Sequence, residues 1–258
     1  MIHRTPCHGT RLMLGSLLLA GLSSTATADA SSGQAIDYQQ GDDTFSGYLA
    51  SAPDEARGTV LIIHDWDGLT DYERQRADML AAQGYDTFAV DLYGKGNRPV
   101  ETDAKKAEIA KLYDDRERMR QLTLAGLEEA RQQGAARPTV VMGYCFGGAV
   151  VLEMARSGQA EDVHGYATFH GGLGTPEGQS YPDDMPPLLV AHGGADSSIS
   201  MEDVATLSEE LETAGATYEI EVYSGAPHAF TVMGSDAYQE RADQKSWTAF
   251  QALLDEAL

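Results

Sequence analysis

The sequence predicts one α/β domain built on a mostly parallel β-sheet with helices on both faces. Short apolar, β-branched segments alternate with helix-like segments along most of the chain, which is typical of strand–helix–strand units. One such segment, Thr59–Ile63, is a continuous apolar run of the kind that a parallel strand buried on both faces shows. No Ser/Pro-rich linker or block of like charge divides the chain, so we expect a single domain over residues 31–258.

The first half of the domain sets this alternation. Thr44–Ala50 precedes the apolar strand and has strand-like composition. Asp71–Gln83 is expected to be a helix, because Gly84 follows it and glycine commonly closes helices. Thr87–Val90 is again strand-like, and Ala104–Gln133 is strongly helical with room for one break.

The second half repeats the pattern. The expected strands are Thr139–Met142, Val163–Phe169, Leu188–Ala191 and Tyr218–Tyr223. The expected helices are Ala149–Arg156, Glu202–Ala214 and Ala237–Ala257. Gly171–Pro187 is rich in Gly and Pro and is expected to form a long loop, the kind of segment that often borders a functional site.

The charge balance excludes some partners. With 40 acidic and 18 basic residues the formal net charge is −22, which opposes binding to nucleic acid and to anionic membranes. The sequence has no G-x-G-x-x-G or P-loop pattern and no spacing of His or carboxylates typical of a metal site. We therefore expect neither a cofactor nor a metal; the composition does not indicate an oligomeric state.

The N-terminus has the features of a signal peptide. Arg4 and Arg11 supply positive charge, and Leu12–Leu22 is a short apolar run, too short to span a bilayer. The small residues at 26–28 offer a cleavage site, and those at 28–30 offer a second one. We therefore expect residues 1–28 to be removed, with cleavage after residue 30 as the alternative, and the mature protein to be periplasmic or secreted.

Cleavage would leave a single cysteine. The chain has two, and Cys7 lies before the apolar run, so only Cys145 would remain in the mature protein. A lone thiol in an oxidising compartment is expected to be either buried and inert or retained for its chemistry.

The surroundings of Cys145 favour chemistry. Residues 143–148 read GYCFGG, between an expected strand and an expected helix, which matches the nucleophile elbow G-x-S-x-G with cysteine in place of serine. The helix N-terminus would favour a thiolate, and the backbone N–H of Phe146 would face a developing oxyanion. The alternative is a buried structural cysteine in a glycine turn.

Two further residues follow the elbow in the chain order of α/β-hydrolases, which is nucleophile, acid, histidine. Asp196 comes after the strand Leu188–Ala191, and His228 comes after the strand ending at Tyr223. As alternatives, Asp196 could cap a turn and His228 could be a surface histidine. His170, also at a strand end, is the rival base, but it precedes Asp196 and so breaks the expected order.

Together these stretches resemble the dienelactone hydrolase family of the α/β-hydrolase superfamily. The resemblance rests on the cysteine elbow, HGGAD at 192–196, APHAF at 226–230 and DLYG at 91–94, and it runs from about Tyr48 to the C-terminus. It implies an α/β-hydrolase fold and cleavage of a small ester or lactone through Cys145, Asp196 and His228, with a thioester acyl-enzyme and no cofactor.

The resemblance also implies roles for other residues. An acidic residue after the third strand of the family holds the resting thiol; that position is Asp65, where the family usually has glutamate. The backbone N–H of Trp66 would be the second oxyanion donor, and its side chain a pocket wall. Family members that prefer anionic dienelactone bind its carboxylate with two arginines. The corresponding positions are Lys106 and Val232, so we expect a preference for neutral substrates.

Two other functions compete with hydrolysis. Cys145 could serve as a redox-sensing thiol, although no resolving cysteine exists in the expected mature chain. The chain could also be a non-catalytic binding protein that keeps the fold without turnover. The sequence does not identify the natural substrate.

Overall fold

The structure is a computed structural model that describes residues 1–3, 33–136 and 138–258. Apart from its first three residues, the expected signal peptide lies outside this described part, as does Cys7. Within it, the central sheet has eight strands in the order β1-β2-β4-β3-β5-β6-β7-β8. The strands are β1 Gln34–Gln40, β2 Asp43–Ala50, β3 Thr59–Ile63, β4 Asp86–Val90, β5 Thr139–Tyr144, β6 Val163–Phe169, β7 Leu188–Gly193 and β8 Tyr218–Tyr223.

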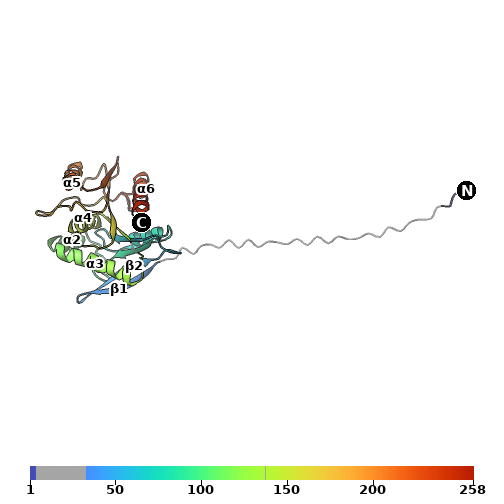
Figure 1. Ribbon diagram of the computed structural model, residues 1–258, viewed down its shortest axis with the longest axis horizontal. Helices are drawn as coiled ribbons and strands as arrows, with labels where there is room; N and C mark the ends of the chain where they lie inside the picture. Colours follow the sequence, from blue (N-terminus) through green and yellow to red (C-terminus); the bar gives the residue numbers. More distant parts are fainter. Residues whose placement is uncertain (4–32, 137) are drawn as a thin grey trace.

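Strand direction confirms the expected mostly parallel sheet. β2 runs antiparallel to both β1 and β4, whereas every other neighbouring pair is parallel. The helices are α1 Asp71–Ala81, α2 Thr102–Asp114, α3 Arg116–Gln132, α4 Phe146–Ser157, α5 Met201–Ala214 and α6 Glu240–Ala257. Figure 1 shows α2 to α5 on one side of the sheet and α6 on the other.

Alternation along the central strands creates the two layers of the core. In β3, Leu61 and Ile63 pack with the side chains of α3, α4 and α5, whereas Val60 and Ile62 pack with those of α1 and α6. All four are fully buried. Successive strand residues point to opposite faces, so a strand that is apolar at every position is what two helical layers require.

The structure adds one strand and moves several boundaries. β1 was not expected; it pairs along its whole length with β2 across a tight turn that contains Gly41 at φ 64°. The expected long helix over residues 104–133 breaks at Asp115, whose side chain caps α3 by accepting from the N–H of Arg118 at 2.9 Å. α4 begins at Phe146 rather than Ala149, because the elbow leads directly into the helix.

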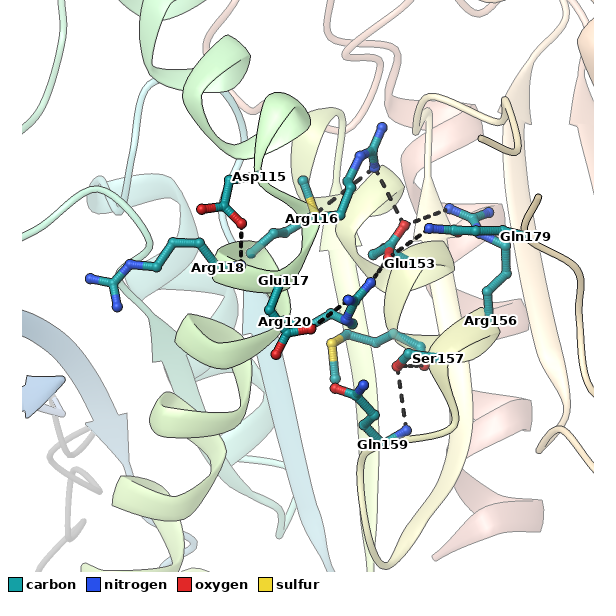
Figure 2. Close-up of polar contacts among 12 residues, drawn as sticks. Asp115, Arg116, Glu117, Arg118, Arg120, Glu153, Arg156, Ser157, Gln159 and Gln179 are labelled. Atoms are coloured by element: carbon teal, nitrogen blue, oxygen red, sulfur yellow. Dashed lines mark hydrogen bonds and ion pairs between the residues drawn. The ribbon is translucent and has the colours of Figure 1, made fainter. Parts of the chain in front are cut away.

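A buried carboxylate links two helices to the loop over residues 171–187. Glu153 of α4 accepts from Arg120 of α3 at 2.5 Å and pairs with Arg116 and Arg156 at 3.6 and 3.3 Å (Figure 2). The amide of Gln179, in the loop, donates to the same carboxylate at 3.1 Å. Glu153 is 1% exposed, so these partners compensate the cost of burying its charge and hold the middle of the loop.

No helix in the described ranges has both the length and the apolar character needed to cross a bilayer.

Candidate active site

Cys145 lies on a sharp turn between β5 and α4. Its φ of 50° and ψ of −111° are a conformation that residues with a side chain rarely adopt. The turn is possible because glycines flank it: a Cβ at Gly143 would meet the carbonyl oxygen of Gly147 at 2.3 Å, and one at Gly147 would meet that of Ile63 at 2.2 Å. This close packing places Cys145 at the carboxyl end of the sheet, directly before the N-terminus of α4.

Three side chains form one hydrogen-bonded chain at this end. Nε2 of His228 lies 3.1 Å from Sγ of Cys145, and its Nδ1 lies 2.8 Å from Oδ2 of Asp196. The other oxygen of Asp196 accepts from the backbone N–H groups of Ser198 and Ile199 at 2.8 and 3.0 Å. The Asp196 side chain is fully buried, and these backbone hydrogen bonds fix its orientation. The carboxylate in turn fixes the orientation of the imidazole.

The surroundings of the Cys145 thiol favour its neutral form. Burial is the main reason that the pKa of Cys145 rises to about 12, and the negative charge of Asp65 raises it further. The N–H of Phe146 acts in the opposite direction but is outweighed. The helix N-terminus therefore acts in the expected direction, toward the thiolate, but burial outweighs it.

His170 lies behind His228 rather than beside the sulfur. It is fully buried, its Nε2 is 2.8 Å from Oγ1 of Thr231, and its ring meets that of His228 edge to face with 5.2 Å between centroids. Burial holds the pKa of His170 well below its usual value, so the ring stays neutral.

The 64–70 loop follows β3 and faces the elbow. Its first residue, His64, is buried and neutral: Nε2 accepts from the N–H of Leu92 at 3.1 Å, and Nδ1 donates to the carbonyl of Asp65 at 2.6 Å. Burial lowers the pKa of His64 to about 4, in agreement with a neutral ring. This histidine fixes the backbone of the loop rather than offering a base to a substrate.

Asp65 is close enough to affect Cys145 electrostatically, but its hydrogen bond goes elsewhere. Its Oδ1 accepts from the N–H of Asp67 at 2.9 Å, whereas the thiol has His228 as its partner. Burial, followed by the neighbouring charge of Glu73, raises the pKa of Asp65 to about 7. The shorter side chain thus acts on the sulfur through its charge, and a direct contact in the resting enzyme stays a prediction.

The structure brings Lys105, rather than Lys106, to the site. Nζ of Lys105 lies 4.9 Å from the centre of the Trp66 ring and 2.5 Å from a carboxylate oxygen of Asp67. Lys106, one residue along α2, is exposed. Val232 is half-buried just beyond the His228 turn.

Two tyrosines near the thiol were not expected. Tyr93 and Tyr113 pack against Phe146 with ring centroids 5.9 and 5.7 Å away, and a negative charge on Cys145 would raise the pKa of both hydroxyls. Tyr93 belongs to the DLYG stretch, whose match could have identified it. Tyr113 reaches the site from the end of α2, and helical periodicity carries no sign of that.

No three His, Cys, Asp or Glu side chains within residues 33–136 and 138–258 are grouped as metal ligands would be.

The chain is similar to several known proteins. The sequence model of the dienelactone hydrolase family matches residues 45–258. A carboxymethylenebutenolidase from Rhodococcus opacus is 28% identical, over 71% of this chain and 74% of its own. A carboxymethylenebutenolidase homolog from Mus musculus is 25% identical, over the same shares of the two chains.

A solved structure is also similar. It is a dienelactone hydrolase-like promiscuous phosphotriesterase from metagenomic libraries, with 26% identity and a TM-score of 0.79. The match covers 87% of this chain and 98% of the other, so it spans nearly the whole described domain.

Proposed function

The chain belongs to the dienelactone hydrolase family, and we propose that it hydrolyses a small ester or lactone with Cys145 as nucleophile. The observation that carries the proposal is the continuous hydrogen-bonded chain from Sγ of Cys145 through His228 to the buried carboxylate of Asp196. A thiol, a neutral imidazole and a fixed carboxylate in this order are the groups that acyl transfer requires.

The reaction proceeds in two steps. His228 takes the thiol proton as Cys145 attacks the carbonyl, and the N–H groups of Phe146 and Trp66 stabilise the oxyanion. Collapse of the tetrahedral intermediate breaks the ester C–O bond, and the imidazolium protonates the leaving oxygen. Water, deprotonated by His228, then cleaves the thioester, returns the thiol and releases the acid. No cofactor is needed for either step.

The raised pKa of Cys145 argues against the redox-sensing alternative. Peroxide reacts with a standing thiolate, and burial raises the pKa of the Cys145 thiol, which lowers the thiolate population at neutral pH. Hydrolysis needs no standing thiolate, because His228 can remove the proton while the carbonyl is attacked. Cys145 is also the only cysteine in the described ranges, so no resolving thiol lies near it there.

We propose an uncharged substrate. Asp65 and Asp67 place carboxylates beside the thiol, and Lys105, a cation near them, is paired with Asp67. Val232 offers no charge to an anion. The carboxymethylenebutenolidase relatives are named for a lactone that bears a carboxylate, so the test compares such a lactone with a neutral one of the same size. We expect kcat/KM to favour the neutral lactone by roughly tenfold or more, the effect of one lost charge-assisted contact.

A phosphotriester is a second candidate substrate. It carries no charge, as the proposed site prefers, and the solved relative is named for this activity. Attack of Cys145 on phosphorus would expel the alcohol, which takes its proton from His228, and water would then cleave the S–P bond. Paraoxon hydrolysis at a rate above that of the Cys145→Ala variant would support it.

The main experiment uses short p-nitrophenyl esters, before and after treatment with stoichiometric iodoacetamide. We expect alkylation to abolish hydrolysis, and Cys145→Ala to lower kcat by roughly 10³-fold or more. Full turnover by the Ala variant would remove Cys145 from the mechanism. An unmodified protein that binds these esters without turnover would favour the non-catalytic alternative.

We also propose that the protein is exported. The positive, apolar and small-residue segments over residues 1–28 support cleavage near Asp29 or Ser31. Mass spectrometry of the protein from its native host would show the shortened chain, whereas an intact Met1 in the soluble cytosolic fraction would contradict export.

A further inference from the structure

Helix α1 contacts two loops of the proposed site: the 64–70 loop, which follows β3, and the 224–232 loop, which follows β8 and contains His228. It carries two charged side chains one turn apart, Glu73 and Arg76, which are 0% and 1% exposed. We propose that α1 sets the position of the 64–70 loop relative to the 224–232 loop, with Glu73 and Arg76 as positioning residues. The inference rests on the proposed function, because the first loop would supply an oxyanion donor and the second supplies the base.

Glu73 holds the 64–70 loop at both of its ends. One carboxylate oxygen accepts from the backbone N–H and the hydroxyl of Thr70, each at 2.8 Å. The other accepts from the backbone N–H of Asp65 at 3.4 Å. Trp66, the proposed oxyanion donor, directly follows Asp65. A shift of this carboxylate would therefore move the backbone that faces the substrate carbonyl.

Arg76 and its neighbour Tyr72 hold the 224–232 loop through a single residue. Nη2 of Arg76 donates to the carbonyl of Thr231 at 2.8 Å and also pairs with Asp243 of α6. The hydroxyl of Tyr72 lies 2.7 Å from Oγ1 of Thr231. Thr231 comes three residues after His228, on the same turn.

Thr231 passes this restraint to the base. Its hydroxyl is also hydrogen-bonded to Nε2 of His170 at 2.8 Å, and the ring of His170 packs edge-on against His228. The catalytic imidazole is thus held by Asp196 from one side and by the His170 ring from another. Because His170 is neutral and buried, it supports the position of His228 without competing for the thiol proton.

Stability alone does not explain these buried charges. Apolar residues of similar volume often stabilise a core as well as a buried ion pair does. Charged groups at Glu73 and Arg76 instead meet specific needs of the loops, since one offers acceptors to N–H groups and the other a donor to a carbonyl. Both side chains belong to one rigid helix, so the position of α1 sets the positions of both loops relative to each other.

The test separates the two loops with two reactions of the same thiol. Ester hydrolysis needs the base and the oxyanion donors, whereas alkylation by iodoacetamide needs the base but no oxyanion donor. Tyr72→Phe and Thr231→Val each remove one hydroxyl of the contact between α1 and the 224–232 loop, and Glu73→Gln removes the carboxylate that holds the 64–70 loop. Tyr38→Phe is the matched control, because it removes the hydroxyl that donates to the Asp91 carbonyl, outside both loops.

We expect Glu73→Gln to lower kcat for p-nitrophenyl butyrate roughly three- to tenfold with alkylation unchanged, the scale of one hydrogen bond. Tyr72→Phe and Thr231→Val should lower both rates by a similar factor, and Tyr38→Phe neither. Alkylation is measured well above the pKa of about 7 of Asp65, so that its charge is the same in all variants.

Some outcomes would overturn the proposal. Equal losses of both rates in all four variants, in step with their thermal stability, would make the contacts merely structural, and unchanged rates would remove their role. If Glu73→Gln does not fold, Thr70→Val replaces it, since it removes one donor to the carboxylate and keeps the charge. If the unmodified protein hydrolyses no ester, the proposed function fails, while the alkylation rates still report whether Tyr72 and Thr231 position His228.

Discussion

The 224–232 loop and the 64–70 loop, which both contact α1, differ in how the charges around them depend on pH. The 224–232 loop is held by an arginine, two hydroxyls and a neutral histidine, none of which changes charge near neutral pH. The 64–70 loop contains Asp65 and Asp67 and rests on a third carboxyl, Glu73. Burial raises the pKa of both Asp65 and Glu73.

This difference divides the work of the site. The base side, which is the 224–232 loop with His228, keeps a fixed geometry, because the buried polar groups that hold it are neutral or permanently paired. The oxyanion side, which is the 64–70 loop, carries charge that varies with pH and that acts on the pKa of Cys145. We therefore expect changes on the base side to alter geometry and rate, and changes on the oxyanion side to alter pH dependence as well as rate.

The largest effect should separate the two histidines of the base side. His228→Ala should lower kcat by roughly 10³-fold, the scale on which triad members act. His170→Ala should stay within about tenfold of the unmodified enzyme, because it removes a support and not the base. Steady-state kinetics with a p-nitrophenyl ester measures both. If the two variants exchange behaviour, His170 is the base and the comparison of the loops no longer holds.

A large effect on stability is expected at Arg76. Arg76→Met leaves Asp243 buried without its cation and should lower the free energy of unfolding by about 3–5 kcal/mol. The double variant Arg76→Met with Asp243→Leu should recover much of that loss, since it removes both charges. Denaturant unfolding measures both variants. A double variant as unstable as the sum of its single variants would show that the pair itself is not what matters.

A smaller effect should appear where α2 meets the 64–70 loop. Lys105→Met removes the cation over Trp66 and the ion pair with Asp67, and should raise KM about two- to tenfold. Lys106→Met is the matched control, because that side chain is exposed and should leave KM unchanged. The opposite result would restore Lys106 as the pocket residue.

Two further effects concern the charge of Asp65. Its pKa is about 7 in the folded protein against 3.8 as an ordinary carboxyl, so the folded state retains a proton that the unfolded chain releases between those values. The stability that this group contributes is thus present at acid pH and is lost as pH rises through the window. Asp65→Asn should remove that decline, which unfolding curves at about pH 4 and about pH 7 would show.

The same variant should change the reactivity of the thiol. Without the Asp65 charge the pKa of Cys145 falls, so we expect iodoacetamide to react roughly two- to tenfold faster at neutral pH. An unchanged alkylation rate across the pH range would mean that the oxyanion side does not tune the thiol.

The sequence predicts well those features whose signal is local. Thr59–Ile63 is apolar throughout because two helical layers cover it, and that run is visible in the chain. β1 escaped prediction because only Tyr38 of its seven residues is buried, so an edge strand of this kind shows no clear alternation. Its position depends on pairing with β2, which composition does not encode.

The site divides in the same way. Cys145, Asp196 and His228 could be singled out because each follows a recognisable strand, and the structure brings them into one hydrogen-bonded chain. Arg76 could not be singled out in this way. Charged residues in helices usually face solvent, and the partners of Arg76 lie more than 150 residues further along the chain. Glu73 left one usable sign, because Thr70 three residues before it forms a capping box.

The backbone of the elbow has a consequence for laboratory evolution. Cys145 sits at a positive φ that glycine adopts with little strain, so Cys145→Gly could stabilise the fold by about 1 kcal/mol while removing the proposed nucleophile. Stability and turnover therefore pull in opposite directions at this position. A library selected for expression or solubility alone would enrich inactive sequences, and variants of this scaffold should be scored for turnover in every round.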